Sequence, residues 1–266
     1  MTPPERWALP DLEAAAARCR ERNAAGIRCI LSPLGEYAAD EAAADRAGEA
    51  YRAAMGAIAA EGLDASVAVK LSALGAAAGL AHWGDRLGLI VDEGRRRHVG
   101  IEIDMEGAAM VGPAIAAAEE AAASGAPSGL AVQAYLNRSA ADLPRILRAG
   151  ITPRLVKGAY IGDTGDFSDI QRRFLDLAAA ALESGRPFSV GTHDPDLIGW
   201  IVGTADRRLI ECGFLMGLAD DTKVRMAREG WRVAEYIPFG EERAAYEGRR
   251  WRYLRSIEAL GRSPVL

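Results

Sequence analysis

The feature that most constrains this chain is a short apolar segment followed by a helical pattern, repeated eight times. The apolar segments are Ile27–Leu31, Ser66–Ser72, Ile101–Asp104, Leu130–Tyr135, Arg154–Ala159, Phe188–Thr192, Leu209–Leu215 and Arg232–Ile237. The helical patterns that follow them are Asp40–Gly62, Trp83–Arg97, Ala114–Ser124, Ala140–Ala149, Ile170–Ser184, Asp196–Thr204, Asp221–Gly230 and Glu241–Gly261. Neighbouring parallel strands need a crossover, which is usually a helix. Eight such units predict an α/β protein with a (β/α)8 TIM-type barrel.

A doubly wound open sheet is the structural alternative, but no GxGxxG sequence follows the first apolar segment. The length of 266 residues suits a single barrel domain. A further helical pattern, Asp11–Gly26, precedes the repeat and is expected to plug or cover part of the barrel. We therefore predict a helical extension over residues 1–26 and a catalytic barrel over residues 27–266.

Composition excludes several classes of protein. A net charge of -5 and a pI near 5.4 provide no basic surface for nucleic acid. No signal sequence and no apolar run of about 18 residues occurs, which predicts a cytoplasmic location. Cys19, Cys29 and Cys212 lack CxxC spacing and are expected to be reduced core residues. Only His193 of the three histidines ends an apolar segment, so no metal site is predicted.

Polar side chains collect where the predicted strands end, most clearly in RLVKGAY from Arg154 to Tyr160. The carboxyl ends of barrel strands form one rim, which carries the active site in barrel enzymes. The rim residues are Glu36, Lys70, Asp104, Gln133, Arg154, Lys157, Thr192, His193, Leu215 and Tyr236. Because polar groups converging on a concave surface are costly to bury without partners, this rim predicts a ligand site.

The last helical pattern places Tyr246, Arg249 and Arg250 on one face, since they are three and four residues apart. Adjacent arginines can bind a carboxylate or phosphate through paired hydrogen bonds. Glu36 and Asp104 on the rim are the expected countercharges for these arginines when no ligand is bound.

Taken together, these segments resemble the proline dehydrogenase family, and the resemblance covers nearly the whole chain in order. The motifs that carry it are LGE (34–36), VKLSALG (69–75), IDMEG (103–107), QAYLNRS (133–139), RLVKGAY (154–160), GTHD (191–194), YIPFG (236–240) and AYEGRR (245–250). The chain differs from the usual family pattern at Ile161, Gly213 and Tyr253.

The resemblance implies a barrel that holds FAD at its mouth and oxidises L-proline to Δ1-pyrroline-5-carboxylate by hydride transfer to the flavin. It implies cofactor contacts from Gln133, Arg154, Val156, Lys157, Ala159, Thr192 and His193. It implies substrate contacts from Lys70, Asp104, Tyr160, Leu215, Tyr236, Tyr246, Arg249 and Arg250, with Glu36 as a gate ion pair. The residues expected to serve catalysis are Arg154, Lys70, Tyr236, Arg249 and Arg250. A quinone or other acceptor would then take the electrons, with transient membrane contact possible.

Four alternatives remain open at this point. The substrate could be another cyclic amine or amino acid. Lys70 or Lys157 could form a Schiff base in a lyase. The barrel could be a non-catalytic binding or scaffold subunit. A metal-dependent hydrolase is disfavoured because only one histidine lies on the rim.

Overall fold

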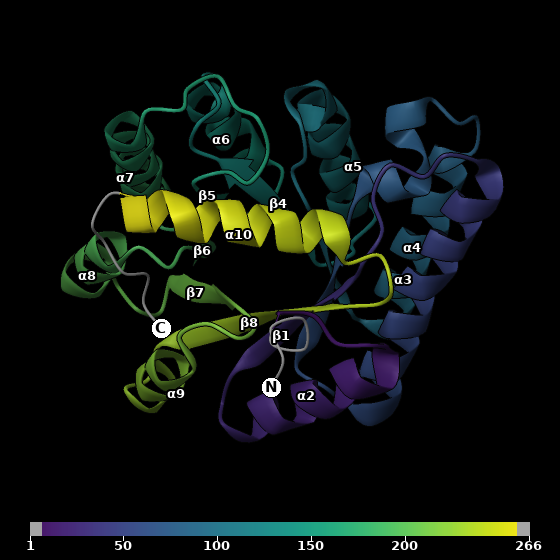
Figure 1. The fold of residues 1–266 in the computed structure, drawn as a ribbon, viewed down its shortest axis with the longest axis horizontal. Helices are drawn as coiled ribbons and strands as arrows, with labels where there is room; N and C mark the ends of the chain where they lie inside the picture. The colour runs from purple at the N-terminus through teal and green to yellow at the C-terminus, as the bar shows by residue number, and fades with distance from the viewer. Residues whose placement is uncertain (1–6, 260–266) are drawn as a thin grey trace.

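The eight apolar segments pair side by side in chain order and close into a barrel of parallel strands (Figure 1). The structure is a computed structural model that describes residues 7–259. The strands are β1 (Arg28–Pro33), β2 (Ala65–Val69), β3 (Gly100–Ile103), β4 (Ser128–Gln133), β5 (Thr152–Val156), β6 (Phe188–Gly191), β7 (Ile210–Leu215) and β8 (Arg232–Phe239). Pairing of β1 with β8 completes the barrel. The predicted (β/α)8 fold is confirmed.

The helices begin and end close to the predicted patterns. They are α2 (Leu12–Ala24), α3 (Glu41–Glu61), α4 (Trp83–Arg97), α5 (Val111–Ala123), α6 (Ser139–Arg148), α7 (Phe167–Glu183), α8 (Pro195–Thr204), α9 (Asp220–Arg228) and α10 (Ala244–Ala259). Short 3-10 turns cover Leu71–Leu74, Ala76–Ala78 and Ala108–Met110. Side-chain caps set several of these boundaries: Asp40 accepts a hydrogen bond from Ala43 N, and Gly62 ends the same helix in the left-handed conformation.

Two parts of the predictions extend beyond the described residues. The proposed extension over residues 1–26 includes residues 1–6, and the last helical pattern was expected to reach Gly261. Within residues 7–259, no helix has both the length and the apolar character needed to cross a membrane. All three cysteines are buried and free, as expected of small core residues.

Helix α2 lies where the helix after β8 would lie in a regular barrel (Figure 1). Its arginines reach both neighbours, since Arg20 pairs with Glu61 at the end of α3 and Arg22 pairs with Asp220 at the start of α9. The predicted covering role is therefore specific: α2 covers the outer side of β1 and β8. This placement leaves α10 free to cross the mouth of the barrel (Figure 1), instead of joining the outer ring as the regular repeat suggested.

Buried charges hold α2 in this position. Glu235 of β8 is fully buried and accepts hydrogen bonds from Lys223 Nζ at 2.5 Å and from Arg18 Nε at 2.9 Å. Arg22 Nε lies 3.1 Å from the same carboxylate. A buried carboxylate needs such partners, because losing one leaves charge that water cannot solvate. The network ties α2, α9 and β8 together.

We expect Arg22→Met to lower the free energy of unfolding by about 2 kcal/mol, since it removes a charged hydrogen bond to Asp220 and an ion pair with buried Glu235. Arg20→Met is the matched control on the same helix. Its ion pair with Glu61 is exposed, so its loss should change stability by less than about 1 kcal/mol. Urea unfolding of the two variants measures the difference, and equal effects would contradict a structural role for the buried cluster.

The barrel interior is charged, whereas barrel interiors are usually filled by branched apolar side chains. The four odd-numbered strands each contribute one charged side chain: Arg28 of β1, Glu102 of β3, Arg154 of β5 and Glu211 of β7. Hydrogen bonds join them across the lumen, with Glu102 between Arg28 and Arg154 and with Glu211 on Arg28. Polar character therefore extends below the predicted rim, and Arg154 lies within its strand rather than after it.

Candidate active site

The centre of the mouth is a cluster of Lys70, Asp104, Arg154 and Tyr236. Asp104 follows β3, and one of its carboxylate oxygens accepts a hydrogen bond from Arg154 Nη2. Its other oxygen lies 2.6 Å from the Tyr236 hydroxyl and 3.1 Å from Lys70 Nζ. Lys70 also donates to Tyr236 and to Ser32 Oγ, each at 3.2 Å. The structure thus brings together four predicted residues, Lys70 directly after β2, Asp104 directly after β3, Arg154 in β5 and Tyr236 in β8. Tyr236, like Arg154, lies inside its strand and not after it.

Opposite charges determine the ionisation of this cluster. Burial disfavours the Asp104 carboxylate, but Lys70 and Arg154 outweigh burial and lower the pKa of Asp104 to about 2. Burial likewise disfavours charged Lys70, yet Tyr236 and Asp104 hold the pKa of Lys70 well above its usual value. Lys70 is therefore a cation at neutral pH. That state suits binding of an anion and argues against the Schiff-base alternative for Lys70, which needs a neutral amine.

The lowered pKa of Asp104 makes its contribution to stability depend on pH. Since the folded-state pKa lies below the unfolded value near 3.9, the stabilisation is fully present above about pH 4 and is lost as pH falls toward 2. We expect the difference in unfolding free energy between wild type and Asp104→Asn to shrink by about 2 kcal/mol across this window. Urea unfolding at a series of pH values measures it, and a difference that stays constant would contradict the ion pairs.

Helix α10 brings Arg249 over the mouth. Arg249 forms a two-pronged ion pair with Glu36, one contact being 2.8 Å from Nη1 to Oε2. Its guanidinium also lies 4.7 Å from the centre of the Tyr160 ring. The predicted pairing of Glu36 with this arginine is present. Asp104 was also expected to pair with the arginines of this helix, but it pairs with Arg154 and Lys70 because it lies deeper in the barrel.

Arg250 is held differently from Arg249. Only 3% of Arg250 is exposed, and its guanidinium packs 5.4 Å from Trp7 and 5.5 Å from Tyr246. It donates to the Tyr246 hydroxyl at 2.7 Å and to the Met216 carbonyl at 3.2 Å. Its Nε has no hydrogen-bond partner among residues 7–259. None of the residues in the described range gives Arg250 a carboxylate within ion-pair distance. A buried cation with only neutral acceptors is prepared for an anion.

The loop after β5 is fixed by Tyr135. The Tyr135 hydroxyl donates to Gln133 Oε1 at 2.6 Å and accepts from Tyr160 N at 2.9 Å. Its ring lies against Gly158 and Gly162, where an added methyl group would come within 1.7 and 2.1 Å of ring carbons. Only glycine permits this approach at the two positions. The contact positions Ala159 and Tyr160 beside Gln133.

A second polar group lies at the ends of β5 and β6. Lys157 Nζ is 2.5 Å from Asp194 Oδ2 and 4.0 Å from the centre of the Phe167 ring. Asp194 also caps α8 through Asp196 N, and Thr192 Oγ1 accepts from Asp194 N at 3.1 Å. His193 Nε2 accepts a hydrogen bond from Leu215 N, which makes His193 the neutral tautomer with its proton on Nδ1. Val156 ends β5 between this group and the loop held by Tyr135.

The sequence patterns did not single out several residues that complete the site: Arg28, Glu102, Glu106, Tyr135 and Trp7. Glu102 was detectable in principle, because IEID places Glu102 and Asp104 two residues apart on one face of a strand. Glu106 and Tyr135 fall inside quoted motifs. Glu106 accepts from Ser72 N and Oγ and so links the loops after β2 and β3. Trp7 precedes the repeat, and no local pattern connects it with α10.

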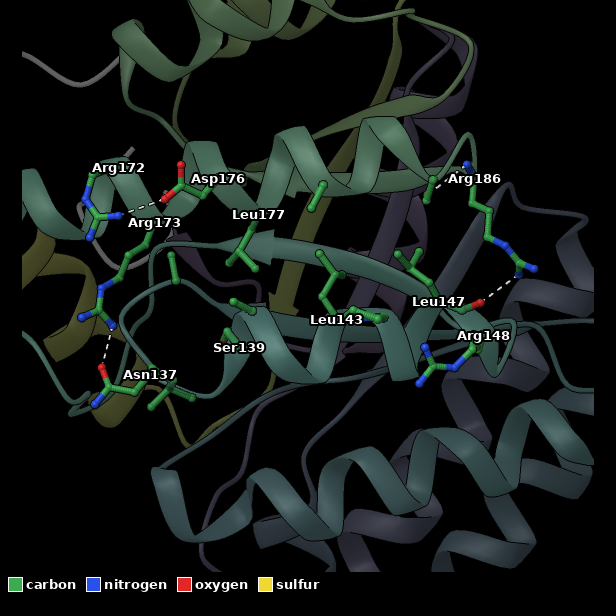
Figure 2. Close-up of a pocket in the computed structure, with 16 residues that line it drawn as sticks. Asn137, Ser139, Leu143, Leu147, Arg148, Arg172, Arg173, Asp176, Leu177 and Arg186 are labelled. Carbon is green, nitrogen blue, oxygen red and sulfur yellow. Dashed lines mark hydrogen bonds and ion pairs between the residues drawn. The ribbon is translucent and has the colours of Figure 1, made fainter.

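A cavity of about 610 Å³ lies outside the barrel, between α6 and α7 (Figure 2). Its floor is apolar, with Leu143, Leu147 and Leu177, and its arginines stand toward the ends (Figure 2). Arg172 and Arg186 are engaged there by Asp176 and by the Leu147 carbonyl. None of the predicted site residues lines this cavity, so it is separate from the mouth.

Comparison with known proteins gives a consistent result. A family model described as proline dehydrogenase matches residues 15–165. Proline dehydrogenase 1 of Bacillus subtilis subsp. natto is 29% identical over 248 residues, which are 90% of this chain and 82% of that protein. Proline dehydrogenase 2 of Bacillus subtilis strain 168 is 24% identical over 250 residues, with the same two shares.

Solved structures share the fold. Proline utilization A from Bdellovibrio bacteriovorus, inactivated by N-propargylglycine, superposes with a TM-score of 0.82 at 18% identity. The alignment covers 93% of this chain but 32% of that protein, so this chain spans about a third of its length.

Proposed function

The chain belongs to the proline dehydrogenase family, and we propose that it oxidises L-proline to Δ1-pyrroline-5-carboxylate with a bound flavin as electron acceptor. The observation that carries this proposal is Arg250, a buried guanidinium at the mouth that has no carboxylate partner among the described residues. A substrate carboxylate would supply the missing charge. Lys70 and Arg249 lie on the same mouth, where the aromatic rings of Tyr160, Tyr236 and Tyr246 offer apolar walls for a five-membered ring.

The residues of β4, β5 and β6 have the chemistry that a flavin requires. An amide, two cations, a hydroxyl and an imidazole lie in or directly after these three neighbouring strands, from Gln133, Arg154, Lys157, Thr192 and His193. Glu102 and Asp104 engage one hydrogen on each terminal nitrogen of Arg154. The Nε hydrogen and the second hydrogen of each terminal nitrogen are left without a described partner. Arg154 can therefore donate toward a cofactor without leaving its carboxylates.

When bound, the flavin supplies a two-electron acceptor for the hydride that leaves the ring carbon next to the proline nitrogen. The protein contributes position and charge. Arg250 and Lys70 hold the carboxylate, while Tyr236 keeps Lys70 oriented through its hydroxyl. Arg249 and Glu36 close over the mouth and limit the access of water. The positive charge of Arg154 would stabilise negative charge that develops on a neighbouring flavin as the flavin is reduced. Glu102 and Asp104 hold Arg154 in place before the reaction begins.

An absorbance experiment tests the proposal. We expect purified protein incubated with flavin to retain it, and anaerobic L-proline to bleach the flavin bands. Pyrrolidine should bleach them more slowly, because it lacks the carboxylate that Arg250 would bind. Protein that stays colourless with excess flavin would contradict the proposed flavin-dependent oxidation of proline and favour a binding or scaffold role. Bleaching by a different cyclic amine, but not by proline, would keep the chemistry and change the substrate.

We further propose that the flavin is FAD, with its phosphates near Lys157 and the start of α8. A helix N-terminus with a neighbouring lysine suits phosphate, but Asp194 now pairs with Lys157. Phosphate binding would require Lys157 to exchange one anion for another. Asp194→Asn keeps an N-cap residue while removing that competition. FAD should then bind about tenfold more tightly, while riboflavin affinity stays the same. Equal changes for both flavins would contradict a phosphate subsite here.

The proposal includes a quinone or another acceptor that reoxidises the flavin, transient contact with a membrane where the acceptor is a membrane quinone, and a cytoplasmic location. Stopped-flow reoxidation with a soluble quinone and with molecular oxygen would separate the acceptors. A reaction much faster with the quinone than with oxygen is expected.

A further inference from the structure

Arg154 is held from inside the barrel as well as from the mouth. Glu102 Oε2 lies 2.5 Å from Arg154 Nη1, and Asp104 binds Nη2. Glu102 and Asp104 belong to the same chain segment, two residues apart, so their side chains point to one face about 7 Å apart along the strand direction. The guanidinium spans this gap with its two terminal nitrogens. Its height along the barrel axis is therefore fixed by two carboxylates.

Glu102 is itself held rigidly. Its Oε1 accepts from Ser66 Oγ at 2.6 Å and from both terminal nitrogens of Arg28 at 3.2 Å. Arg28 in turn donates to Glu211 Oε1 at 3.2 Å. Arg154, Glu102, Glu211 and Ser66 are all buried. The support of Arg154 thus reaches through the lumen to the amino-terminal end of the barrel.

Charges alternate along this chain of contacts. Three carboxylates alternate with three cations, and each contacts the next, in the order Glu211, Arg28, Glu102, Arg154, Asp104 and Lys70. The interior is therefore electrically balanced. Arg154 shares its charge between two carboxylates, and only Asp104 belongs to the rim. Glu102 lies beneath the rim, and it contacts the cluster at the mouth through Arg154.

We infer that Glu102 is a positioning residue for Arg154 and that its negative charge limits how strongly Arg154 favours the reduced cofactor. The inference rests on the proposed flavin function. A reduced flavin carries more negative charge than the oxidised form, so a buried carboxylate behind Arg154 opposes reduction. Removing that carboxylate charge makes reduction of the cofactor easier.

The test is the reduction potential of the bound flavin in wild type and in Glu102→Gln, measured with dye equilibration at pH 8. We expect the variant to favour reduced over oxidised flavin by about tenfold more than wild type, which equals a rise of about 30 mV for a two-electron couple. Glu211→Gln is the matched control. This variant removes the same charge from the same network, but Arg28 and Glu102 separate Glu211 from Arg154. The reduction potential of the flavin bound to Glu211→Gln should therefore stay close to that of wild type.

Two results would overturn the inference: an unchanged potential in Glu102→Gln, or equal rises in Glu102→Gln and Glu211→Gln, which would indicate a general charge effect. If Glu102→Gln fails to fold, Glu102→Gln with Arg28→Met keeps the interior balanced. The reduction potential of the flavin in this double variant is expected to rise by less than about 30 mV. An unchanged potential in the double variant would count against the inference. Failure of the proposed function has a different signature, because wild-type protein would take up no flavin at all.

Discussion

Arg250→Met is expected to reduce kcat/KM for L-proline at least about thirtyfold while changing kcat/KM for pyrrolidine by less than about threefold. A lost charged hydrogen bond in a buried site typically costs about 2 to 5 kcal/mol. Arg250 has no carboxylate within the described structure, so its charge is available to the substrate. Methionine preserves the packing against Trp7 and Tyr246, which separates loss of charge from loss of structure.

Arg249→Met is the control for this prediction. Glu36 already compensates the charge of Arg249, so the loss for proline should be smaller, about tenfold. Its removal also leaves Glu36 beside the mouth without its cation, which should repel carboxylate substrates. Steady-state kinetics of both variants with both amines measures the comparison. Equal losses for proline and pyrrolidine in Arg250→Met would show that Arg250 anchors α10 and does not read the carboxylate.

Arg154→Met is expected to slow reduction of the bound flavin by about a hundredfold to a thousandfold, the usual effect of removing one preorganised charge from a transition state. Proline affinity should change much less, because Arg154 is held by Glu102 and Asp104 beneath the substrate residues. Anaerobic rapid mixing separates the two quantities, since the rate at saturating proline reports reduction and its half-saturation reports binding.

Arg154→Lys is the matched variant, because it keeps the charge but cannot span two carboxylates. It should recover part of the reduction rate. Arg154→Met should also destabilise the fold by about 3 to 5 kcal/mol, since it leaves two carboxylates without their shared cation. A normal reduction rate combined with weakened proline binding in Arg154→Met would reverse the assigned role.

The two arginines on α10 show what helical spacing predicts about a site and what it does not. Spacing predicted that Tyr246, Arg249 and Arg250 lie together, and Tyr246 does contact Arg250. Helical spacing does not distinguish the two arginines from each other. Only the crossing of α10 over the mouth brings Arg249 to Glu36, 213 residues away in the chain, and Arg250 to Met216.

The sequence by itself determined the barrel, because strand and helix periodicities are local properties and eight alternating units leave few ways to pair in parallel. It also predicted that Lys70, Asp104, Arg154 and Tyr236 lie together at the mouth, since residues at the carboxyl ends of the strands share one rim, and these four side chains are in contact. Only the tertiary structure decided the charged lumen, in which Arg28 contacts Glu211 across 183 residues and Glu102 joins Arg28 to Arg154. Such contacts depend on barrel closure, which brings alternate strands face to face. Local periodicity carries no information about which charges then meet.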